Sequence, residues 1–409
     1  MSAGWVRGAC PSLSAPMPTG DGLLVRMTPR RGALTVAQLA GIAEAAGKFG
    51  NGAIEITARG SLQIRGLSDR TVDGFGRAIE TLGIEAEGAP EIRAGALAGR
   101  DADEIADPSP LADAIRQRIE AHGIVADLAP KVSVVVDGGG ALSLASVAAD
   151  IRLEATDAET WRVCVGRGGT DSVAIGRGDA DKAVAASVAL LDLLAQAGRQ
   201  ARARDLTGGA WSPVAAMLAP AGAAIPSAPA SPVGVFVLND GTVARGFALP
   251  FGQIDAKALQ SFAASLDPKF ELRLAPMRGL LVLGLLHDES DEVGAIADAH
   301  GLVVDAGDLR RKIAACAGAP ACASAHLPTK SIAQSVVALH PDLLAALPAL
   351  HISGCGKQCA RPAGPSLSLI GTAAEPELIE DGVRADDEVR ALLIELARAP
   401  AEARKRRHA

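Results

Sequence analysis

Four of the six cysteines in this 409-residue chain fall into two tight pairs. Cys316 and Cys322 lie in CAGAPAC, a C-x5-C spacing, and Cys355 and Cys359 lie in CGKQC, a C-x3-C spacing. Thiolates bind iron–sulfur clusters or zinc, and the longer first spacing suits a structural zinc ion poorly. Glycines beside each pair allow the backbone to approach a cluster and offer it amide donors. The pairs predict an iron–sulfur site, and the competing interpretation is four unrelated buried thiols.

Two strand–helix–strand units are expected to position this site. In the first, GLLVRM is typical of a strand, TVAQLAGIAEAAGKF of an amphipathic helix, and AIEITARGSLQIRGL of two strands around a turn. A second unit begins near residue 233 and has the same order. Three landmarks recur in both units: Gly32 and Gly252, Arg59-Gly60 and Arg278-Gly279, Gly66-Leu67 and Gly284-Leu285. The recurrence predicts an internal duplication, although any two units of this type share some likeness.

A longer region of mixed strands and helices follows each unit, so the chain is expected to be an α/β or α+β protein. The segment 205–232 is rich in Ala, Pro, Gly and Ser and is predicted to be a linker. The second mixed region holds all four paired cysteines.

Composition narrows the function. The net charge of −7 argues against nucleic-acid binding as the main task. Hydrophobic residues make up 49 %, which is enough for packed cores, but aromatic residues are only 2 %. The N-terminus shows no signal-peptide pattern and no apolar run is long enough to span a membrane, so a cytoplasmic location is expected. In that compartment the cysteines are expected to be ligands or buried thiols rather than disulfides.

The cysteine spacing resembles the cluster motif of the siroheme-dependent sulfite and nitrite reductases. EITARGSLQIRGL is similar to that family's strand–turn–strand motif, and EIRAGALAGRDADEIADPSPLADAI and LAPKVSVVVDGGG resemble the segments that follow it. The resemblance implies an α+β fold with duplicated sulfite/nitrite-reductase-like architecture. Its expected parts are a signature segment at 1–20, ferredoxin-like half-domains at 21–84 and 233–289, and larger α/β domains at 85–204 and 290–409, with the linker at 205–232.

The N-terminal stretch RGACPSLSAPMPTGDGLLVRM and the stretch HISGCGKQCARP resemble a narrower family, the precorrin-3B synthases. These are monooxygenases of aerobic cobalamin biosynthesis. The resemblance implies a [4Fe–4S] cluster, a mononuclear non-haem iron and no siroheme. It implies that precorrin-3A, a tetrapyrrole, is hydroxylated at its C20 carbon with O2 and that a γ-lactone forms. Departures at Thr28 and Ser133, where the reductases carry cations, favour this narrower family.

The resemblance also carries residue roles. It makes Cys316, Cys322, Cys355 and Cys359 the [4Fe–4S] ligands, with Cys359 facing the tetrapyrrole cleft. A buried carboxylate of the substrate needs a cation or several donors. Positions that match the family's tetrapyrrole or anion contacts supply such cations, and further candidates lie on the same repeat unit: Arg59, Arg93, Lys131, Arg26 and Arg65. The alternative for each is an ordinary surface charge.

The sequence does not identify the ligands of the mononuclear iron. Non-haem iron often takes two histidines and a carboxylate. His326 follows Cys322 closely and His351 precedes Cys355, so each is a candidate iron ligand or hydrogen-bond partner of the cluster. The glycine tracts do not match a dinucleotide-binding or P-loop motif, so no nicotinamide or flavin domain is expected. Electrons would come from an external donor such as an NADH-dependent reductase.

Two other functions stay open. One is a siroheme-dependent sulfite or nitrite reductase, which would share the cysteine motif and the duplication. The other is a non-catalytic iron–sulfur electron carrier or sensor, which would need the cluster but no substrate cleft. Neither nucleic acid nor a membrane is expected as a partner.

Overall fold

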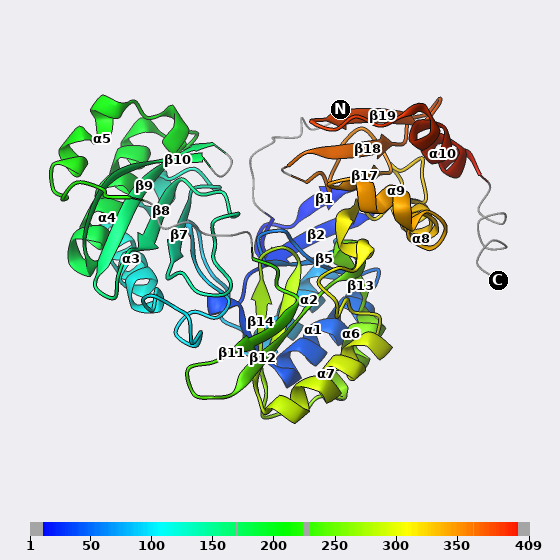
Figure 1. Cartoon of the computed structure of the whole chain (residues 1–409), viewed down its shortest axis with the longest axis horizontal. Helices are drawn as coiled ribbons and strands as arrows, with labels where there is room; N and C mark the ends of the chain where they lie inside the picture. The colour runs from blue at the N-terminus through cyan, green and yellow to red at the C-terminus, as the bar shows by residue number, and fades with distance from the viewer. Residues whose placement is uncertain (1–10, 169–170, 224–229, 363, 400–409) are drawn as a thin grey trace.

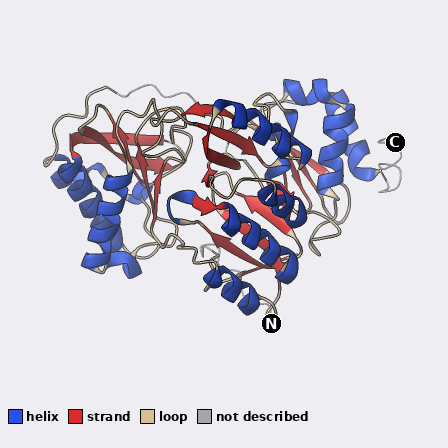
Figure 2. Cartoon of the chain, turned by 90° about the horizontal axis from the view of Figure 1, so that it is seen from below, coloured by secondary structure: helices blue, strands red, loops and turns tan. Residues whose placement is uncertain are grey.

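The computed structural model describes residues 11–168, 171–223, 230–362 and 364–399 (Figure 1). The first ten residues of the predicted signature segment lie outside the described residues. Four sheets form the framework, two in the middle of the molecule and one in each of two lobes that lie on either side. Figure 2 shows helices lying against the sheets in all parts of the molecule.

The first half-domain is a five-stranded sheet with two helices on one face. Its strands run in the order β1 (Met17–Thr19), β2 (Gly22–Met27), β5 (Leu62–Leu67), β4 (Ala53–Ile56) and β13 (Gln253–Asp255). Its helices are α1 (Val36–Phe49) and α2 (Val72–Thr81). The edge strand β13 belongs to the second repeat by its position in the chain, yet it pairs antiparallel with β4 of the first repeat.

The second half-domain has the same plan and a reciprocal exchange. Its strands run β11 (Gly234–Val237), β12 (Val243–Ala248), β15 (Gly279–Leu285), β14 (Glu271–Ala275) and β3 (Ala33–Thr35). Its helices are α6 (Ala256–Ala264) and α7 (His287–Ala299). Strand β3 belongs to the first repeat and pairs with β14. Each repeat thus gives an edge strand to the other, and one apolar core runs through both half-domains.

Local sequence explains why the exchanged strands lie where they do. Arg31 and Phe251 both adopt a left-handed conformation, with φ of 56° and 57°, and a left-handed glycine follows each. Each turn leads into the exchanged strand and then a capped helix: Thr35 caps α1 and Asp255 caps α6 through their side chains. The turns, strands and caps therefore recur together, which agrees with the predicted duplication.

Strand register corrects one detail of that duplication. Met27 pairs with Leu62 in the first sheet, and the equivalent Phe247 pairs with Leu280 in the second. Gly60 therefore matches Arg278, one residue earlier than the predicted match with Gly279. Both residues have positive φ, which supports this assignment.

The first larger domain is a five-stranded mixed sheet. Its strands run β10 (Asp171–Asp179), β9 (Thr160–Gly168), β8 (Ile151–Ala155), β7 (Ser133–Asp137) and β6 (Glu91–Ala94). Its helices are α3 (Ser109–His122), α4 (Ala180–Ala197) and α5 (Gly208–Ala215). Helix α5 lies inside the predicted linker at 205–232, yet Trp211 and Val214 are buried in this domain's core. The first part of that segment therefore packs as domain structure.

The second larger domain holds the cysteines. Its strands run β16 (Ile313–Ala315), β17 (Leu350–Ser353), β18 (Ser366–Ile370) and β19 (Glu377–Asp381), with the first three parallel. Its helices are α8 (Thr329–Leu339), α9 (Pro341–Ala346) and α10 (Asp387–Arg398). No helix in the described part of the chain is long and apolar enough to cross a membrane.

Candidate cluster and substrate site

The two cysteine pairs follow neighbouring parallel strands. Cys316 comes directly after β16, and Cys355 comes two residues after β17. The carboxyl ends of parallel strands meet at one edge of a sheet, so both cysteine loops start at the same place. Two backbone hydrogen bonds join them: Cys316 N donates to Ile352 O at 3.2 Å, and His326 N donates to Gly354 O at 2.7 Å.

Hydrogen bonding and burial both affect the ionisation of the paired cysteines. The amide of Gly354 donates to the Cys316 Sγ at 3.2 Å. Burial raises the pKa of the Cys316 thiol, and hydrogen bonds from Gly354 and Gly318 oppose this. Desolvation likewise raises the pKa of Cys359, and so do the charges of Cys316, Cys355 and Cys322. Cys359 therefore lies within electrostatic range of the other three thiols.

These features fit the predicted cluster. Within the described residues, no set of three or more His, Cys, Asp or Glu side chains is arranged to hold a single metal ion. A four-iron cluster binds each thiolate at a separate iron, so its ligands lie farther apart than those of one ion. Glycines let the loops pack closely: a Cβ on Gly354 would come within 2.5 Å of the Ala325 Cβ. The thiols, the amide donor and the close loops suit such a cluster, which stays a prediction.

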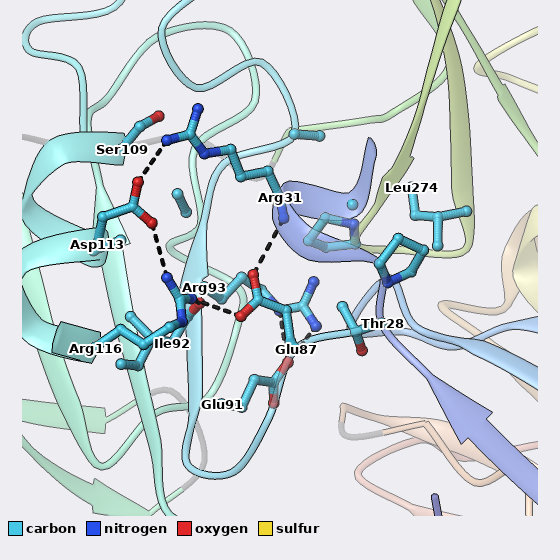
Figure 3. A pocket seen from close by; sticks show the side chains of 16 residues that line it. Thr28, Arg31, Glu87, Glu91, Ile92, Arg93, Ser109, Asp113, Arg116 and Leu274 are labelled. Carbon is cyan, nitrogen blue, oxygen red and sulfur yellow. Dashed lines mark hydrogen bonds and ion pairs between the residues drawn. The ribbon is translucent and has the colours of Figure 1, made fainter. Parts of the chain in front are cut away.

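The predicted cations Arg59 and Arg93 meet at one carboxylate. Arg59 Nε donates to Glu91 Oε2 at 3.1 Å, and Arg93 Nε donates to Glu91 Oε1 at 2.8 Å. Burial works to raise the Glu91 pKa, but the charges of Arg93 and Arg59 outweigh it and the pKa is lowered. The ionised trio therefore keeps one net positive charge. Figure 3 shows Arg93 and Glu91 lining a pocket that extends to Thr28 and Leu274.

Arg26 belongs to a polar row that crosses the first half-domain, which we call the polar ladder: Arg26, Gln63, Glu55 and Gln253. Arg26 Nε donates to Gln63 Oε1 at 3.0 Å, and Gln63 donates to Glu55. Gln253 Nε2 donates to Glu55 Oε1 at 2.8 Å and to the carbonyl of Ala315 at 3.2 Å. Since Ala315 precedes Cys316, the polar ladder joins a candidate substrate cation to the first cysteine loop.

The structure separates the other two candidate cations from the Arg59–Arg93 pair. Arg65 is 8 % exposed and is bound by Asp21 and Glu55. Lys131 is exposed two residues before β7 and does not share the Glu91 carboxylate among the described contacts. Arg59 and Arg93 thus form the best-defined cationic group, and the substrate role of all five cations stays a prediction.

The two candidate iron ligands, His351 and His326, differ in burial. His351 is fully buried in β17, its Nδ1 lies 3.0 Å from Ser368 Oγ, and its Nε2 has no hydrogen-bond partner. Burial lowers its pKa to about 4, so the ring is neutral near pH 7. The His326 side chain is exposed. A neutral imidazole with an unpartnered nitrogen suits a ligand, but the described residues around it do not complete a mononuclear iron site.

Sequence reasoning missed Glu91, Gln63 and Gln253. Glu91 had a signal: it stands two residues before Arg93 on one strand, so both side chains lie on the same face. Gln63 has the same relation to Arg65. Gln253 had none, because its partner Glu55 is 198 residues away in the chain.

Comparison with known proteins agrees with this geometry. A model of the nitrite/sulfite reductase ferredoxin-like half domain matches residues 15–82. The solved structure of the Mycobacterium tuberculosis NirA protein matches with a TM-score of 0.69, at 21 % identity, over 87 % of this chain and 73 % of that chain. The chain is therefore a protein of the nitrite and sulfite reductase fold, which confirms the predicted α+β class with its ferredoxin-like half-domains.

A closer relationship defines the family within that class. A precorrin-3B synthase from a Sinorhizobium species is 39 % identical over 391 residues, which cover 92 % of this chain and 83 % of that protein. The chain belongs to the precorrin-3B synthase family. This confirms the family predicted from the N-terminal and cysteine motifs. The domain boundaries stay predictions.

Proposed function

We propose that the chain hydroxylates precorrin-3A at its C20 carbon with O2 and forms the γ-lactone, as a cytoplasmic precorrin-3B synthase. The observation that carries this proposal is the polar ladder, which joins the candidate substrate cation Arg26 to the first cysteine loop. The 39 % identity to a precorrin-3B synthase supports the same assignment.

In this proposal the cations hold the carboxylates of the tetrapyrrole. Arg59 and Arg93 share Glu91 and keep one net positive charge, so together they balance one carboxylate without repelling each other. Arg26 offers a second contact at the start of the polar ladder. The Thr28 hydroxyl donates to the Ser61 hydroxyl at 2.8 Å, and Ser61, which also accepts from Arg93, can donate to a further acceptor atom. These contacts would fix the orientation of the macrocycle.

Cys316, Cys322, Cys355 and Cys359 would hold the [4Fe–4S] cluster. Such a cluster supplies single electrons to oxygen chemistry when it is bound. The protein's own contribution is to hold the thiolates at one sheet edge and to bring the Gly354 amide to the Cys316 sulfur. An external donor such as an NADH-dependent reductase would supply the electrons. His351 and His326 stay candidates for the predicted mononuclear iron, and we derive no step through that iron.

The experiment is a reaction with a defined product. The chain is reconstituted anaerobically with iron and sulfide, then given precorrin-3A, O2 and an NADH-dependent reductase. We expect a product that has gained one hydroxyl and a lactone, identified by mass and by ¹⁸O from labelled O2. A reconstituted protein that leaves precorrin-3A unchanged would contradict the proposal. A chain treated identically with Arg59 and Arg93 both replaced by Gln should bind the substrate more weakly.

The two alternatives are less well supported. A siroheme-dependent reductase resembles this chain in its cysteine spacing, but it carries cations where this chain has Thr28 and Ser133. Its visible spectrum would show intense siroheme absorption bands in place of the one broad shoulder of a cluster. An electron carrier or sensor has no use for the Arg59–Arg93 pair, and it would show cluster redox chemistry without precorrin-3A turnover.

A further inference from the structure

The turn of the N-terminal hairpin packs against the first cysteine loop. A Cβ placed on Gly20 would lie 2.4 Å from the Cys322 Sγ and 2.8 Å from the Ser324 Oγ, which is closer than non-bonded atoms approach. The Gly20 carbonyl accepts a hydrogen bond from the Ala323 amide at 2.7 Å. Figure 1 shows β1 and β2 (blue) beside the cysteine-bearing domain (orange). The first half-domain therefore forms a wall of the cysteine site, and that wall requires a residue without a side chain.

The next residue, Asp21, holds Arg65. Arg65 Nε donates to Asp21 Oδ2 at 2.7 Å, and Arg65 Nη2 donates to Asp21 Oδ1 at 2.8 Å. The Asp21 side chain is fully buried, and Thr19 Oγ1 donates to it at 2.7 Å. Glu55 takes the third nitrogen of Arg65 at 3.4 Å. The guanidinium is thus fixed in one orientation by the same turn that contacts Cys322.

Hydrogen bonds place Arg65 beside the cysteine site. Asp21, which holds Arg65, directly follows Gly20, which contacts the Cys322 sulfur. Glu55, the other partner of Arg65, is joined through Gln253 to the carbonyl of Ala315, the residue before Cys316. Burial would lower the Arg65 pKa, but Asp21 and Glu55 keep it above its ordinary value. A permanent positive charge therefore stands beside the cysteine site. All its guanidinium nitrogens have protein partners, so Arg65 is poorly placed to bind a substrate carboxylate.

We propose that residues 19–22 are a positioning element of the cysteine site. Gly20 sets the place of Cys322, and Asp21 orients Arg65 so that its charge favours the reduced state of a cluster bound at this site. A reduced cluster carries one more negative charge than an oxidised one, and a nearby cation stabilises that charge. The inference rests on the proposed cluster and assigns Arg65 to the cluster side of the cleft.

The first test concerns Gly20. Gly20→Ala would force the Cys322 sulfur to move, so we expect anaerobic reconstitution to give less than half the iron and sulfide per chain of the unmodified protein, or an altered electron paramagnetic resonance spectrum. Gly76→Ala is the matched control, because nothing lies within 4 Å of a Cβ at Gly76 in α2. Its cluster content and spectrum should be unchanged. Circular dichroism checks that both variants are folded.

The second test separates charge from packing. Asp21→Asn keeps the shape of the side chain and removes a negative charge, so the midpoint potential of the cluster should rise. Arg65→Gln removes the cation and should lower the potential. A purely structural role would not give shifts of opposite sign. If Arg65→Gln does not fold, the rise in Asp21→Asn alone still has to be seen.

The outcomes distinguish this inference from the proposed function. If the unmodified chain takes up no cluster, the proposed cluster is wrong and the inference is wrong with it. If the unmodified chain takes up the cluster, then unchanged loading and spectrum in Gly20→Ala, together with an unchanged potential in Asp21→Asn, overturn the inference alone.

Discussion

In the first half-domain the polar ladder crosses the sheet as Arg26, Gln63, Glu55 and Gln253. By strand register, the matching row of the second half-domain is Gly246, Leu281, Arg273 and Ala33. Leu281 and Leu283 are buried in an apolar cluster with Leu97 and Leu142 of the first larger domain. One backbone plan therefore supports two faces of different chemistry. The face beside the cysteine loops carries a row of linked polar side chains, and its counterpart keeps one buried cation, Arg273, among leucines packed against the first larger domain.

The larger domains differ in a related way. Asp101 stands as far beyond the end of β6 as Cys322 stands beyond the end of β16. Asp137 ends β7, where Ser353 ends β17 just before the second cysteine pair. The first larger domain thus has carboxylates after β6 and β7, and the second has thiols after the corresponding strands β16 and β17. Duplication preserves the loops, and the side chains on them determine which half can bind a soft metal cluster.

The largest expected effect tests whether the cluster belongs to the second half only. Cys355→Ala removes one of four thiolates, so reconstituted protein should lose nearly all cluster-bound iron and sulfide. Cys164→Ala is the control, since Cys164 is buried in β9 of the other larger domain. Iron and sulfide analysis and the visible spectrum measure both. Full cluster content in Cys355→Ala would contradict the assignment of that residue.

The second prediction transfers one side chain between the sheets. Leu281→Gln puts the amide of Gln63 at its matched position, which is fully buried among apolar side chains. The facing polar side chain is Arg273, which already donates to Glu271 and to the carbonyls of Ala96 and Ala98. An amide buried beside leucines with that cation already engaged should lower the free energy of unfolding by about 2–5 kcal/mol. Urea denaturation measures the change. Leu281→Met, which keeps the volume and stays apolar, should cost less than about 1.5 kcal/mol. A Gln variant as stable as the Met variant would show that the second face is not dry.

The third prediction concerns Glu91, whose charge neutralises one of the two cations that it binds, Arg59 and Arg93. Glu91→Gln leaves Arg59 and Arg93 without their shared charge and should destabilise the protein by about 1–3 kcal/mol at pH 7. Because the Glu91 pKa is lowered on folding, its stabilisation is present above the ordinary carboxyl pKa and is lost as the pH falls through the folded value. The difference between the variants should therefore shrink in acid.

Urea denaturation at several pH values measures this difference. Glu85→Gln is the control, because Glu85 is 77 % exposed and lies 3.5 Å from Arg30 in an exposed ion pair. Its effect should stay within about 0.5 kcal/mol. An effect of Glu91→Gln that does not change with pH would mean that its ionised form is not what holds the two arginines.

Features written in local sequence could be predicted. The cysteine spacing, the helix-forming stretches and the recurring Gly32 and Gly252 depend on neighbouring residues, and they gave the fold class and the duplication. Family resemblance gave Arg59 and Arg93 as cations, although their shared carboxylate was missed. The offset of Gly279 went unnoticed because sequence spacing alone does not give strand register.

Contacts between the exchanged strands could not be predicted. Gln253 reaches Glu55 only because β13 crosses into the first sheet, and no local pattern in either repeat encodes that pairing. The role of Asp21 likewise depends on a partner 44 residues away in the chain. Helix α5 could not be predicted because Gly208, Gly209 and Pro213 disfavour a helix, yet Trp211 anchors it in the core.

The smallest expected effect comes from the carboxylates that stand where the other domain has thiols. Burial raises the pKa of Glu104 to about 7, and the charges of Asp107, Asp101 and Asp137 add to this effect. The folded protein thus binds a proton that the unfolded chain releases near pH 4.5, so this group lowers stability as the pH rises through about 7. Glu104→Gln keeps an acceptor for the Gly99 amide and cannot ionise. It should match the unmodified protein at pH 5 and exceed it by on the order of 1–2 kcal/mol at pH 8, after allowance for partial exposure. Urea denaturation at both pH values measures this, and equal stability at pH 8 would show that the acidic strand ends carry no strain from their shared charge.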